Sequence, residues 1–187
     1  RYAGRGVSAC ATCDGFFYRK KTVAVVGGGD TACEEASYLS NLAKKVYMIV
    51  RKDYLRASKV MQRRVMENQK IEIFFNTNTV GLFGDAKVEG AHLVRFKGTD
   101  REETFDIAID GFFLGIGHRP NTDIFASQIA LDEQGYIKTD GVTTATNIPG
   151  VFAAGDVADP RYRQAITSAG MGCKAALDAE RFLVEQE

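Results

Sequence analysis

The sequence predicts an α/β fold in which a parallel β-sheet carries an antiparallel insertion. An apolar stretch at 22–26, a glycine-rich turn, an amphipathic stretch and a second apolar stretch at 45–50 fit within about 30 residues, as in a strand–helix–strand unit. From about 79 to 107 the pattern changes to short alternating stretches separated by turn signals, which is typical of an antiparallel meander. The 187 residues are 45% hydrophobic, which is enough for a sizeable core.

Hydrophobic periodicity defines the first strand–helix–strand unit. Residues 22–26, TVAVV, are β-branched or apolar throughout, which indicates a strand buried on both faces. Residues 45–50, KVYMIV, predict a second strand. The helix between them has one apolar face, made of Ala32, Ala36, Leu39 and Ala43.

The elements that follow extend the sheet. Residues 58–68 predict an amphipathic helix with Ser58 as its N-cap, and residues 71–75 predict a third strand. Residues 111–117, after the meander, predict another buried strand.

A polar, turn-rich segment at 118–123 marks the expected domain boundary. We therefore expect one domain over residues 1–119 and a second region over 120–187. The elements expected in this second region are a short hairpin at 128–138, a strand within 150–156 and a helix from about Ala165 to Val184.

Composition excludes several classes of function. Lys and Arg number 24 and Asp and Glu also 24, a balance that argues against a nucleic-acid partner. No apolar run approaches the roughly 18 residues of a membrane span, so no membrane partner is expected. Four cysteines are too few for a secreted disulfide scaffold, which favours a cytoplasmic location. The opening residues, RYAGRGV, read like the interior of a longer protein, so we expect a fragment.

Gly27, Gly29 and Ala32 fit the pattern G-x-G-x-x-A directly after a strand and at the start of a helix. In such a turn the first glycine allows the tight bend and the second lets the backbone approach a pyrophosphate. The small third residue packs the helix on the strand, and the pyrophosphate rests on the helix N-terminus. The alternative is a plain strand-to-helix turn. We favour a Rossmann-like dinucleotide-binding domain.

Basic residues follow the second strand, where an NAD site would place an acid for the ribose 2′-hydroxyl. Val50 ends the strand, and Arg51, Lys52 and Arg56 come next, with Asp53 among them. Cations here would bind a 2′-phosphate, so we expect NADPH rather than NADH. The alternative is a solvated basic loop.

Cys10 and Cys13 are separated by two residues, and Asp14 follows directly. A zinc site needs four ligands, and the other cysteines and histidines are not paired at ligand spacing. A CxxC motif lowers a thiol pKa, so a redox disulfide is favoured over a metal site or an inert pair. Asp14 could donate a proton to a leaving thiolate, or it could be a solvated turn acid or a helix cap.

Two further features of the sequence are weaker indications of structure and function. Cys33 and Cys173 lie among small residues in helical contexts, which predicts that both are buried packing residues. Gly155 and Asp156 follow an apolar stretch, where an acid is well placed to hold a ligand hydroxyl.

Together these stretches resemble bacterial-type thioredoxin reductase. The resemblance covers the whole chain, and the combination in this order is highly specific. The matching stretches are ACATCDG (9–15), VAVVGGGDTACEEASYL (23–39), RKDYLRA (51–57), IGHRPNT (116–122), GVFAAGDV (150–157) and YRQAITSAGMGCKAA (162–176).

The resemblance implies a flavoprotein with two dinucleotide-binding domains. Residues 1–119 would be the NADPH-binding domain that carries the redox disulfide. Residues 120–187 would be the C-terminal portion of a split FAD-binding domain. Electrons would pass from NADPH to FAD, then to the disulfide and then to thioredoxin, in a homodimer.

The resemblance also implies roles for single residues. Cys13 would be the flavin-facing thiol, Cys10 the thiol that attacks thioredoxin, and Asp14 the general acid. The expected cofactor-binding residues are Gly27, Gly28, Gly29, Asp30, Thr31, Ala32, Arg51, Lys52, Arg56, Ile116 and Gly117 for NADPH, and Gly155, Asp156, Arg163, Gln164 and Ala165 for FAD.

Three features depart from the family pattern. Val50 stands where the family usually has His, so one basic contact is missing. Asp30 places an acid near the expected pyrophosphate. The family's N-terminal FAD half, with its own glycine motif, is not in this sequence, so residues 120–187 would lack the strands with which their sheet should pair.

Two alternatives compete with this interpretation. The flavoprotein subunit of alkyl hydroperoxide reductase shares the same core, although the Ala-Thr between the cysteines favours thioredoxin reductase. A bare NADP-binding module without turnover would describe the 187 residues in isolation, and the truncated chain would then be inactive.

Overall fold

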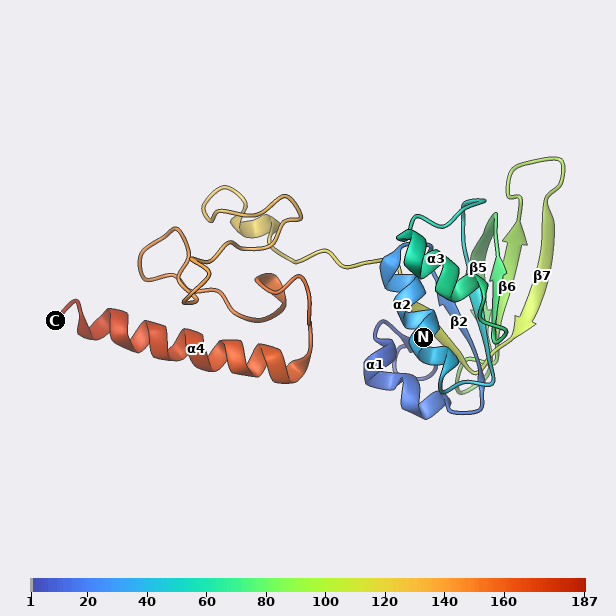
Figure 1. Cartoon of the computed structure of the whole chain (residues 1–187), viewed down its shortest axis with the longest axis horizontal. Helices are drawn as coiled ribbons and strands as arrows, with labels where there is room; N and C mark the ends of the chain where they lie inside the picture. Colours follow the sequence, from blue (N-terminus) through green and yellow to red (C-terminus); the bar gives the residue numbers. More distant parts are fainter. Residues whose placement is uncertain (1) are drawn as a thin grey trace. The chain divides into compact units, whose positions relative to one another are not determined.

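The computed structural model describes residues 2–187 and divides the chain into two compact units, Arg1–Gly117 and His118–Glu187. This division falls two residues before the boundary expected from the sequence. The helices and strands, several of them labelled in Figure 1, are β1 (Val7–Ser8), α1 (Ala11–Asp14), η1 (Gly15–Tyr18), β2 (Thr22–Val26), α2 (Asp30–Ser40), β3 (Lys45–Ile49), α3 (Lys59–Met66), β4 (Ile71–Phe74), β5 (Thr77–Phe83), β6 (Gly90–Arg95), β7 (Glu103–Ala108), β8 (Gly111–Leu114), η2 (Asp123–Phe125), η3 (Gly155–Val157) and α4 (Ala165–Val184).

The first unit is built on a five-stranded parallel sheet with the strand order β1-β8-β2-β3-β4. Val25 of β2 is paired with Met48 of β3 on one side and with Phe113 of β8 on the other. The centre of the sheet therefore lies at the strand that ends in the glycine turn. The parallel sheet expected from the strand–helix–strand unit is confirmed.

Both faces of this sheet are covered, which explains why β2 is apolar after Thr22. Figure 1 shows α2 and α3 on one side and strands β5 to β7 on the other. Val25 packs in the helix-side core with Ala36 and Leu39 of α2. Ala24 faces the other way and packs in a second core with Leu93 of β6.

The antiparallel meander is also confirmed. β5, β6 and β7 form a separate three-stranded sheet in that order, and both pairings are antiparallel. The predicted helix at 58–68 appears as the shorter α3, with Ser58 at its N-cap. The Ser58 side chain makes no capping hydrogen bond; instead, the Ser58 backbone N–H donates to Asp30 Oδ1 at 3.0 Å.

The second unit corrects two predictions. The hairpin expected at 128–138 is a single antiparallel bridge between Leu131 and Ile137. The strand expected within 150–156 is likewise a single bridge, between Ala145 and Phe152. Apolar residues alone do not make a strand, and neither segment has a neighbour that continues the ladder beyond one residue pair.

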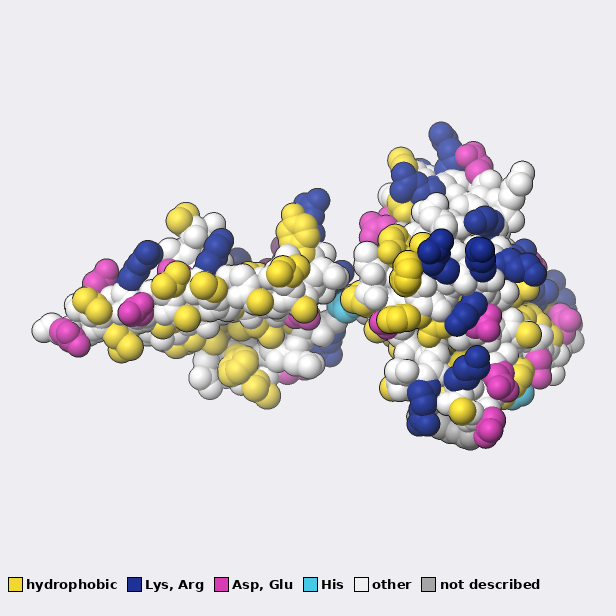
Figure 2. Space-filling model, turned by 90° about the horizontal axis from the view of Figure 1, so that it is seen from below, with side chains coloured by type: hydrophobic (Ala, Val, Ile, Leu, Met, Phe, Trp, Pro, Cys, Tyr) yellow, Lys and Arg dark blue, Asp and Glu magenta, His cyan; other side chains and the backbone are white. Residues whose placement is uncertain are grey.

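The predicted C-terminal helix is confirmed as α4, but none of its residues is buried. Figure 2 shows hydrophobic side chains along its visible face, and the side chain of Ile166 is 82% exposed. Cys173, predicted to be buried, is exposed because it lies on this uncovered helix, whereas Cys33 of α2 is buried as predicted. Within residues 2–187 there is no helix both long and apolar enough to cross a bilayer.

Candidate functional site

The glycine turn between β2 and α2 is shaped by contacts that exclude larger residues. Gly27 has a φ of 137°, and a Cβ at this position would collide with the carbonyl oxygen of Gly115. At Gly28 a Cβ would lie 2.9 Å from Val50 Cγ1. At Gly29, the N-cap of α2, a Cβ would meet nothing within 4 Å. The turn is thus packed against the protein at its first two glycines and open at the third.

A cavity of about 740 Å³ opens in front of this turn, entirely within the first unit. Its walls include nine of the residues predicted to bind NADPH, from three separate parts of the sequence. These are Gly27, Gly28, Gly29, Thr31, Arg51, Lys52, Arg56, Ile116 and Gly117. Their assignment as nucleotide ligands remains a prediction.

The other two residues predicted on the NADPH side lie beside the cavity rather than in its wall. Ala32 is buried and packs in the helix-side core, as its small side chain suggested. Asp30 is exposed, and hydrogen bonds from the Ser58 backbone and side chain lower the pKa of its carboxyl. Asp30 is therefore engaged by the start of α3.

The basic loop after β3 is tied to the glycine turn. The backbone N–H groups of Arg56 and Ala57 donate to the Gly28 carbonyl oxygen at 2.6 and 3.2 Å. Leu55 is buried, while the Arg51 and Lys52 side chains are exposed. The loop backbone is therefore fixed, and its cationic side chains stand at the edge of the cavity.

The sequence analysis missed part of the cavity wall. Tyr54 and the start of β5, Thr77 to Thr79, also line it. Tyr54 lies inside the basic stretch 51–57, so its position in the sequence is a signal for it. The β5 residues carry no local signal, because only the folding of the meander against the parallel sheet brings them to the cavity.

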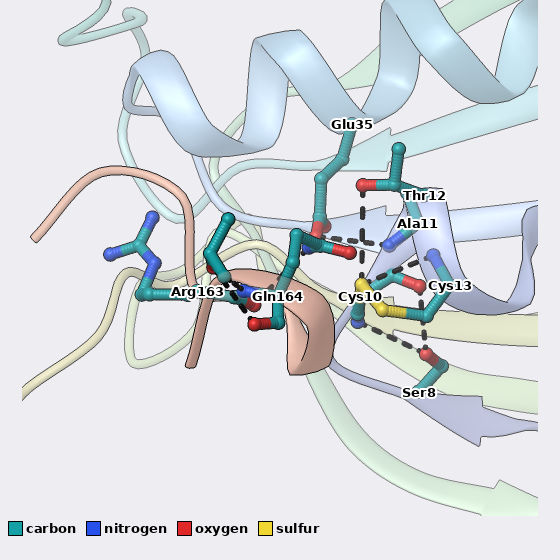
Figure 3. Close-up of a disulfide and its surroundings, with 9 residues drawn as sticks. Ser8, Cys10, Ala11, Thr12, Cys13, Glu35, Arg163 and Gln164 are labelled. Atoms are coloured by element: carbon teal, nitrogen blue, oxygen red, sulfur yellow. Dashed lines mark hydrogen bonds between the residues drawn. A yellow bond between two sulfur atoms is a disulfide. The ribbon is translucent and has the colours of Figure 1, made fainter. Parts of the chain in front are cut away.

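Cys10 and Cys13 form a disulfide across the single turn of α1 (Figure 3). Cys10 is the N-cap of this turn, and its Sγ accepts a hydrogen bond from the Cys13 N–H at 3.1 Å. The buried Ser8 holds the entry to the turn, because its Oγ accepts the Cys10 N–H at 3.0 Å. Cys10 is half-buried and Cys13 is exposed.

An acid and two aromatic residues follow the disulfide closely in the sequence. Asp14 is half-buried at the C-terminal end of α1, and it makes no side-chain cap of the following η1. Phe16 and Phe17, which come next, are 64% and 70% exposed. Across residues 2–187 no three His, Cys, Asp or Glu side chains gather as a metal site would require.

The sequence analysis also missed an acid on α2, Glu35. Its Oε1 accepts the backbone N–H of Ala11, the first residue of α1, at 3.4 Å (Figure 3). Burial raises the pKa of the Glu35 carboxyl, and this hydrogen bond opposes the rise. The neighbouring thiol of Cys33 also titrates abnormally, since burial raises its pKa to about 11.

The second unit holds the residues predicted to contact FAD. Gly155, with a φ of 75°, leads into Asp156, whose Oδ1 accepts the Ser168 hydroxyl at 3.1 Å. Arg163 has a left-handed φ of 48°, Gln164 is the N-cap of α4, and Ala165 is its first residue. These five predicted residues thus lie around the start of α4.

A buried carboxylate shapes the loop before α4. Asp159 accepts the backbone N–H groups of Arg161 and Tyr162 at 2.8 and 3.0 Å. The carboxylate thereby fixes the segment in which the left-handed Arg163 follows. Sequence reasoning missed Asp159, although an Asp followed by Pro signals a turn.

Comparisons with known proteins agree with this arrangement. The family model described as pyridine nucleotide-disulphide oxidoreductase matches residues 1–172. The chain is 55% identical over 188 residues to the mitochondrial thioredoxin reductase of Kluyveromyces lactis, covering 100% of this chain and 53% of that protein. It is 56% identical over 190 residues to the thioredoxin reductase of Coxiella burnetii, covering 97% of this chain and 58% of that one.

Solved structures give the same result. The thioredoxin reductase of Streptococcus pyogenes matches with a TM-score of 0.89 and 38% identity, over 97% of this chain and 58% of that one. The thioredoxin reductase of Giardia duodenalis matches with a TM-score of 0.85 and 45% identity, over 96% of this chain and 58% of that one. The chain therefore spans slightly more than half the length of the relatives it matches.

Proposed function

Because the chain belongs to the pyridine nucleotide-disulphide oxidoreductase family, we propose that the protein containing it is an NADPH-dependent thioredoxin reductase. Electrons would pass from NADPH through FAD to the Cys10–Cys13 disulfide, and from there to thioredoxin. One observation carries the proposal: the first unit holds both an accessible CxxC disulfide and a glycine-lined cavity with a basic edge.

The residues of the cavity fit NADPH. Gly29 leaves space at the N-terminus of α2, where backbone N–H groups and the helix dipole favour a pyrophosphate. Arg51, Lys52 and Arg56 would hold the 2′-phosphate through charge-assisted hydrogen bonds. Ile116 and Gly117 follow β8 and would form another wall of the same site.

The second unit fits one side of an FAD site. When bound, FAD would supply a centre that accepts a hydride and releases two electrons to a disulfide. Asp156 would hold a ligand hydroxyl, and the first residues of α4 would approach the cofactor closely. The exposed apolar residues of α4 suit a helix that is covered in a longer chain.

The disulfide itself would carry the chemistry to the partner. Two electrons and two protons convert Cys10–Cys13 to two thiols. After Cys10 gives up its proton, its thiolate attacks the thioredoxin disulfide, forming a mixed disulfide and releasing one thioredoxin thiolate, which takes up a proton. Cys13 attacks Cys10 Sγ, which restores the internal disulfide and releases reduced thioredoxin. Asp14 would supply a proton to the leaving thiolate.

The surroundings of the disulfide suit a protein substrate. The Cys13 N–H already points at Cys10 Sγ and would stabilise a thiolate there. Phe16 and Phe17 offer exposed aromatic surface directly after the motif, as protein interfaces often do. We prefer thioredoxin reductase to the flavoprotein subunit of alkyl hydroperoxide reductase because the relatives described above are named thioredoxin reductases.

We extend the proposal to assembly and location. A homodimer is proposed from the resemblance alone. A cytoplasmic location is proposed because a CxxC pair in the reducing cytosol is more often catalytic than structural.

The test is a turnover assay on the protein that contains this chain. Purified protein is mixed with NADPH and oxidised thioredoxin, and NADPH consumption is followed together with the appearance of thioredoxin thiols. Equal consumption of NADPH and production of dithiol supports the proposal. NADPH oxidation with no thiol production, or faster reduction of a peroxidase disulfide than of thioredoxin, would contradict it.

A further inference from the structure

Glu35 is a titratable group that the proposed electron path does not use, although it contacts the turn that carries the disulfide. It lies on α2, next to the small residues that pack that helix into the core. Its neighbour Glu34 is exposed, whereas Glu35 is half-buried. Two acids that are adjacent in the sequence are thus placed in different surroundings.

The contact is made with the first peptide of α1. The Ala11 N–H donates to Glu35 Oε1 at 3.4 Å, and Ala11 itself is 2% exposed. Glu35 Oε2 is shielded from solvent and has no hydrogen-bond partner among residues 2–187. A carboxylate with one buried, unpartnered oxygen and one long hydrogen bond on the other is costly, which calls for an explanation other than stability.

The position of Ala11 supplies that explanation. Ala11 directly follows Cys10, and its N–H is one of the donors at the start of the turn that would otherwise be free to stabilise a thiolate on Cys10. Glu35 engages this donor and brings a negative charge to the same turn. A like charge disfavours a thiolate and favours the protonated thiol.

We propose that Glu35 is a positioning residue that holds the first turn of α1 and lowers the fraction of Cys10 that is a thiolate in the reduced pair, so that Cys10 loses its proton mainly when it attacks a partner disulfide. Opening the disulfide breaks the S–S bond with two electrons, and the product takes up two protons if both sulfurs end as thiols but one if a thiolate remains. The Glu35 charge favours the two-proton product. This makes the pair harder to reduce and therefore a better donor of electrons to another disulfide.

The remaining titratable groups near the turn do not take this role. Asp14 is at the other end of α1, and Tyr18 lies on η1. Burial, followed by the charges of Asp14 and Asp110, raises the Tyr18 pKa, so this phenol stays neutral at physiological pH. Glu35 is the carboxylate that the structure places against the peptide following Cys10.

The experiment uses the 187-residue chain and measures thiol reactivity. The chain is reduced with dithiothreitol, freed of reductant and treated with iodoacetamide at pH about 7. Near this pH the labelling rate of each cysteine depends strongly on the fraction of it that is a thiolate. Mass spectrometry of the peptides then gives the rate at each cysteine. Cys173 is exposed and serves as an internal reference, and Cys33 is buried and reports that the fold is intact.

Three variants separate the effect of the charge from other effects. Glu35→Gln keeps an acceptor for the Ala11 N–H but removes the charge, Glu34→Gln removes a charge from the exposed neighbour, and Glu35→Asp keeps a carboxylate. We expect Glu35→Gln to speed labelling of Cys10 about twofold to fivefold, since a lower thiol pKa raises the thiolate population while reducing its nucleophilicity. Glu34→Gln and Glu35→Asp should label Cys10 at close to the wild-type rate.

An unchanged rate in Glu35→Gln, or an equal rise in Glu34→Gln, would overturn the proposal. If Cys33 becomes labelled in Glu35→Gln, the fold is damaged and Glu35→Asp decides. A wild-type rate at Cys10 in that variant supports the proposal, and a raised rate rejects it.

The inference rests on the proposed redox use of Cys10–Cys13, but its test contains no NADPH, FAD or thioredoxin. A negative labelling result would reject the role of Glu35 and would leave the proposed thioredoxin reductase activity to be decided by the turnover assay. A failed turnover assay likewise leaves the labelling result as a statement about this cysteine pair.

Discussion

The backbone N–H of Arg56 donates a 2.6 Å hydrogen bond to the carbonyl oxygen of Gly28, and so joins the basic loop to the glycine turn. The two parts of the proposed NADPH site that recognise different phosphates are therefore fixed to each other by the backbone. The side chains are left free to meet the ligand. Loss of a side chain at this edge should change affinity without disturbing the fold.

Replacing Arg51 by Ala should weaken NADPH binding about 10- to 150-fold, the loss expected for a charge-assisted hydrogen bond to the 2′-phosphate. NADH lacks that phosphate, so its affinity should hardly change. Titration calorimetry with both nucleotides measures the difference. Arg64→Ala is the matched control, because Arg64 is exposed on α3 and does not line the cavity. Equal losses for NADPH and NADH would reject the assignment of Arg51.

Two glycines of the same turn should respond differently to alanine. At Gly29 the added Cβ meets nothing in the protein, so Gly29→Ala should melt like the wild type. The methyl group would occupy the space proposed for the pyrophosphate, and NADPH affinity should fall at least about tenfold as its backbone hydrogen bonds are lost.

At Gly27 the φ of 137° and the collision with the Gly115 carbonyl make the same change structural. Gly27→Ala should lower the free energy of unfolding by about 1–3 kcal/mol, the cost of a strained backbone position. Thermal denaturation and nucleotide titration of both variants give the comparison. A Gly29→Ala chain that binds NADPH normally would show that the pyrophosphate lies elsewhere.

In the proposed thioredoxin reductase, Cys10→Ser should abolish reduction of thioredoxin, because the attacking thiol is gone. In this variant Cys13 remains without its disulfide partner, so it should accept electrons from the flavin poorly at best. The reduction potential of the intact pair should lie near the roughly −270 mV of thioredoxin, since about 30 mV already shifts the equilibrium tenfold. Cys173→Ser is the control, because Cys173 is an exposed cysteine of the second unit and should be dispensable. Full turnover in Cys10→Ser would remove Cys10 from the mechanism.

The 187-residue chain alone should bind NADPH but hold no stoichiometric FAD. The proposed NADPH site lies wholly in the first unit, whereas the second unit offers one side of a flavin site and a helix with no buried residue. Hydrogen exchange should be slow in residues 22–50 and faster after residue 120. Absorbance of the purified chain in the visible region checks the flavin. A yellow chain with one FAD per molecule would contradict this prediction and also the description of the chain as a bare nucleotide-binding module.

The parts of the fold that sequence could predict are those determined locally. TVAVV had to be a strand buried on both faces, and the glycines after it had to form a tight turn. GVFAA has an equally apolar composition but forms only one bridge at Phe152, because a strand depends on a partner that composition does not reveal. Cys173 was misjudged for the same reason: helical spacing of small residues does not show whether anything covers the helix.

The candidate site also contains residues that local sequence signals predict and residues that only the folded structure brings there. Arg51 can be predicted from the basic stretch after the second strand, and the two cysteines can be predicted from their CxxC spacing. Thr79 reaches the cavity only through the meander, and Glu35 reaches the disulfide turn only through the packing of α2 against α1. Nothing in the letters EE indicates which of the two acids turns inward.

Strand β1 has a mechanical consequence for the disulfide. It contains two residues, pairs with β8, has a single further bridge from Val7 to Ala3, and is followed after one residue by Cys10. The reactive sulfur is thus tethered to the shortest strand at the margin of the sheet. In the proposed reaction, a force applied through a mixed disulfide with thioredoxin would be transmitted to this edge strand. The reach of Cys10 toward thioredoxin, in the proposed reaction, would then depend on how firmly β1 stays paired with β8.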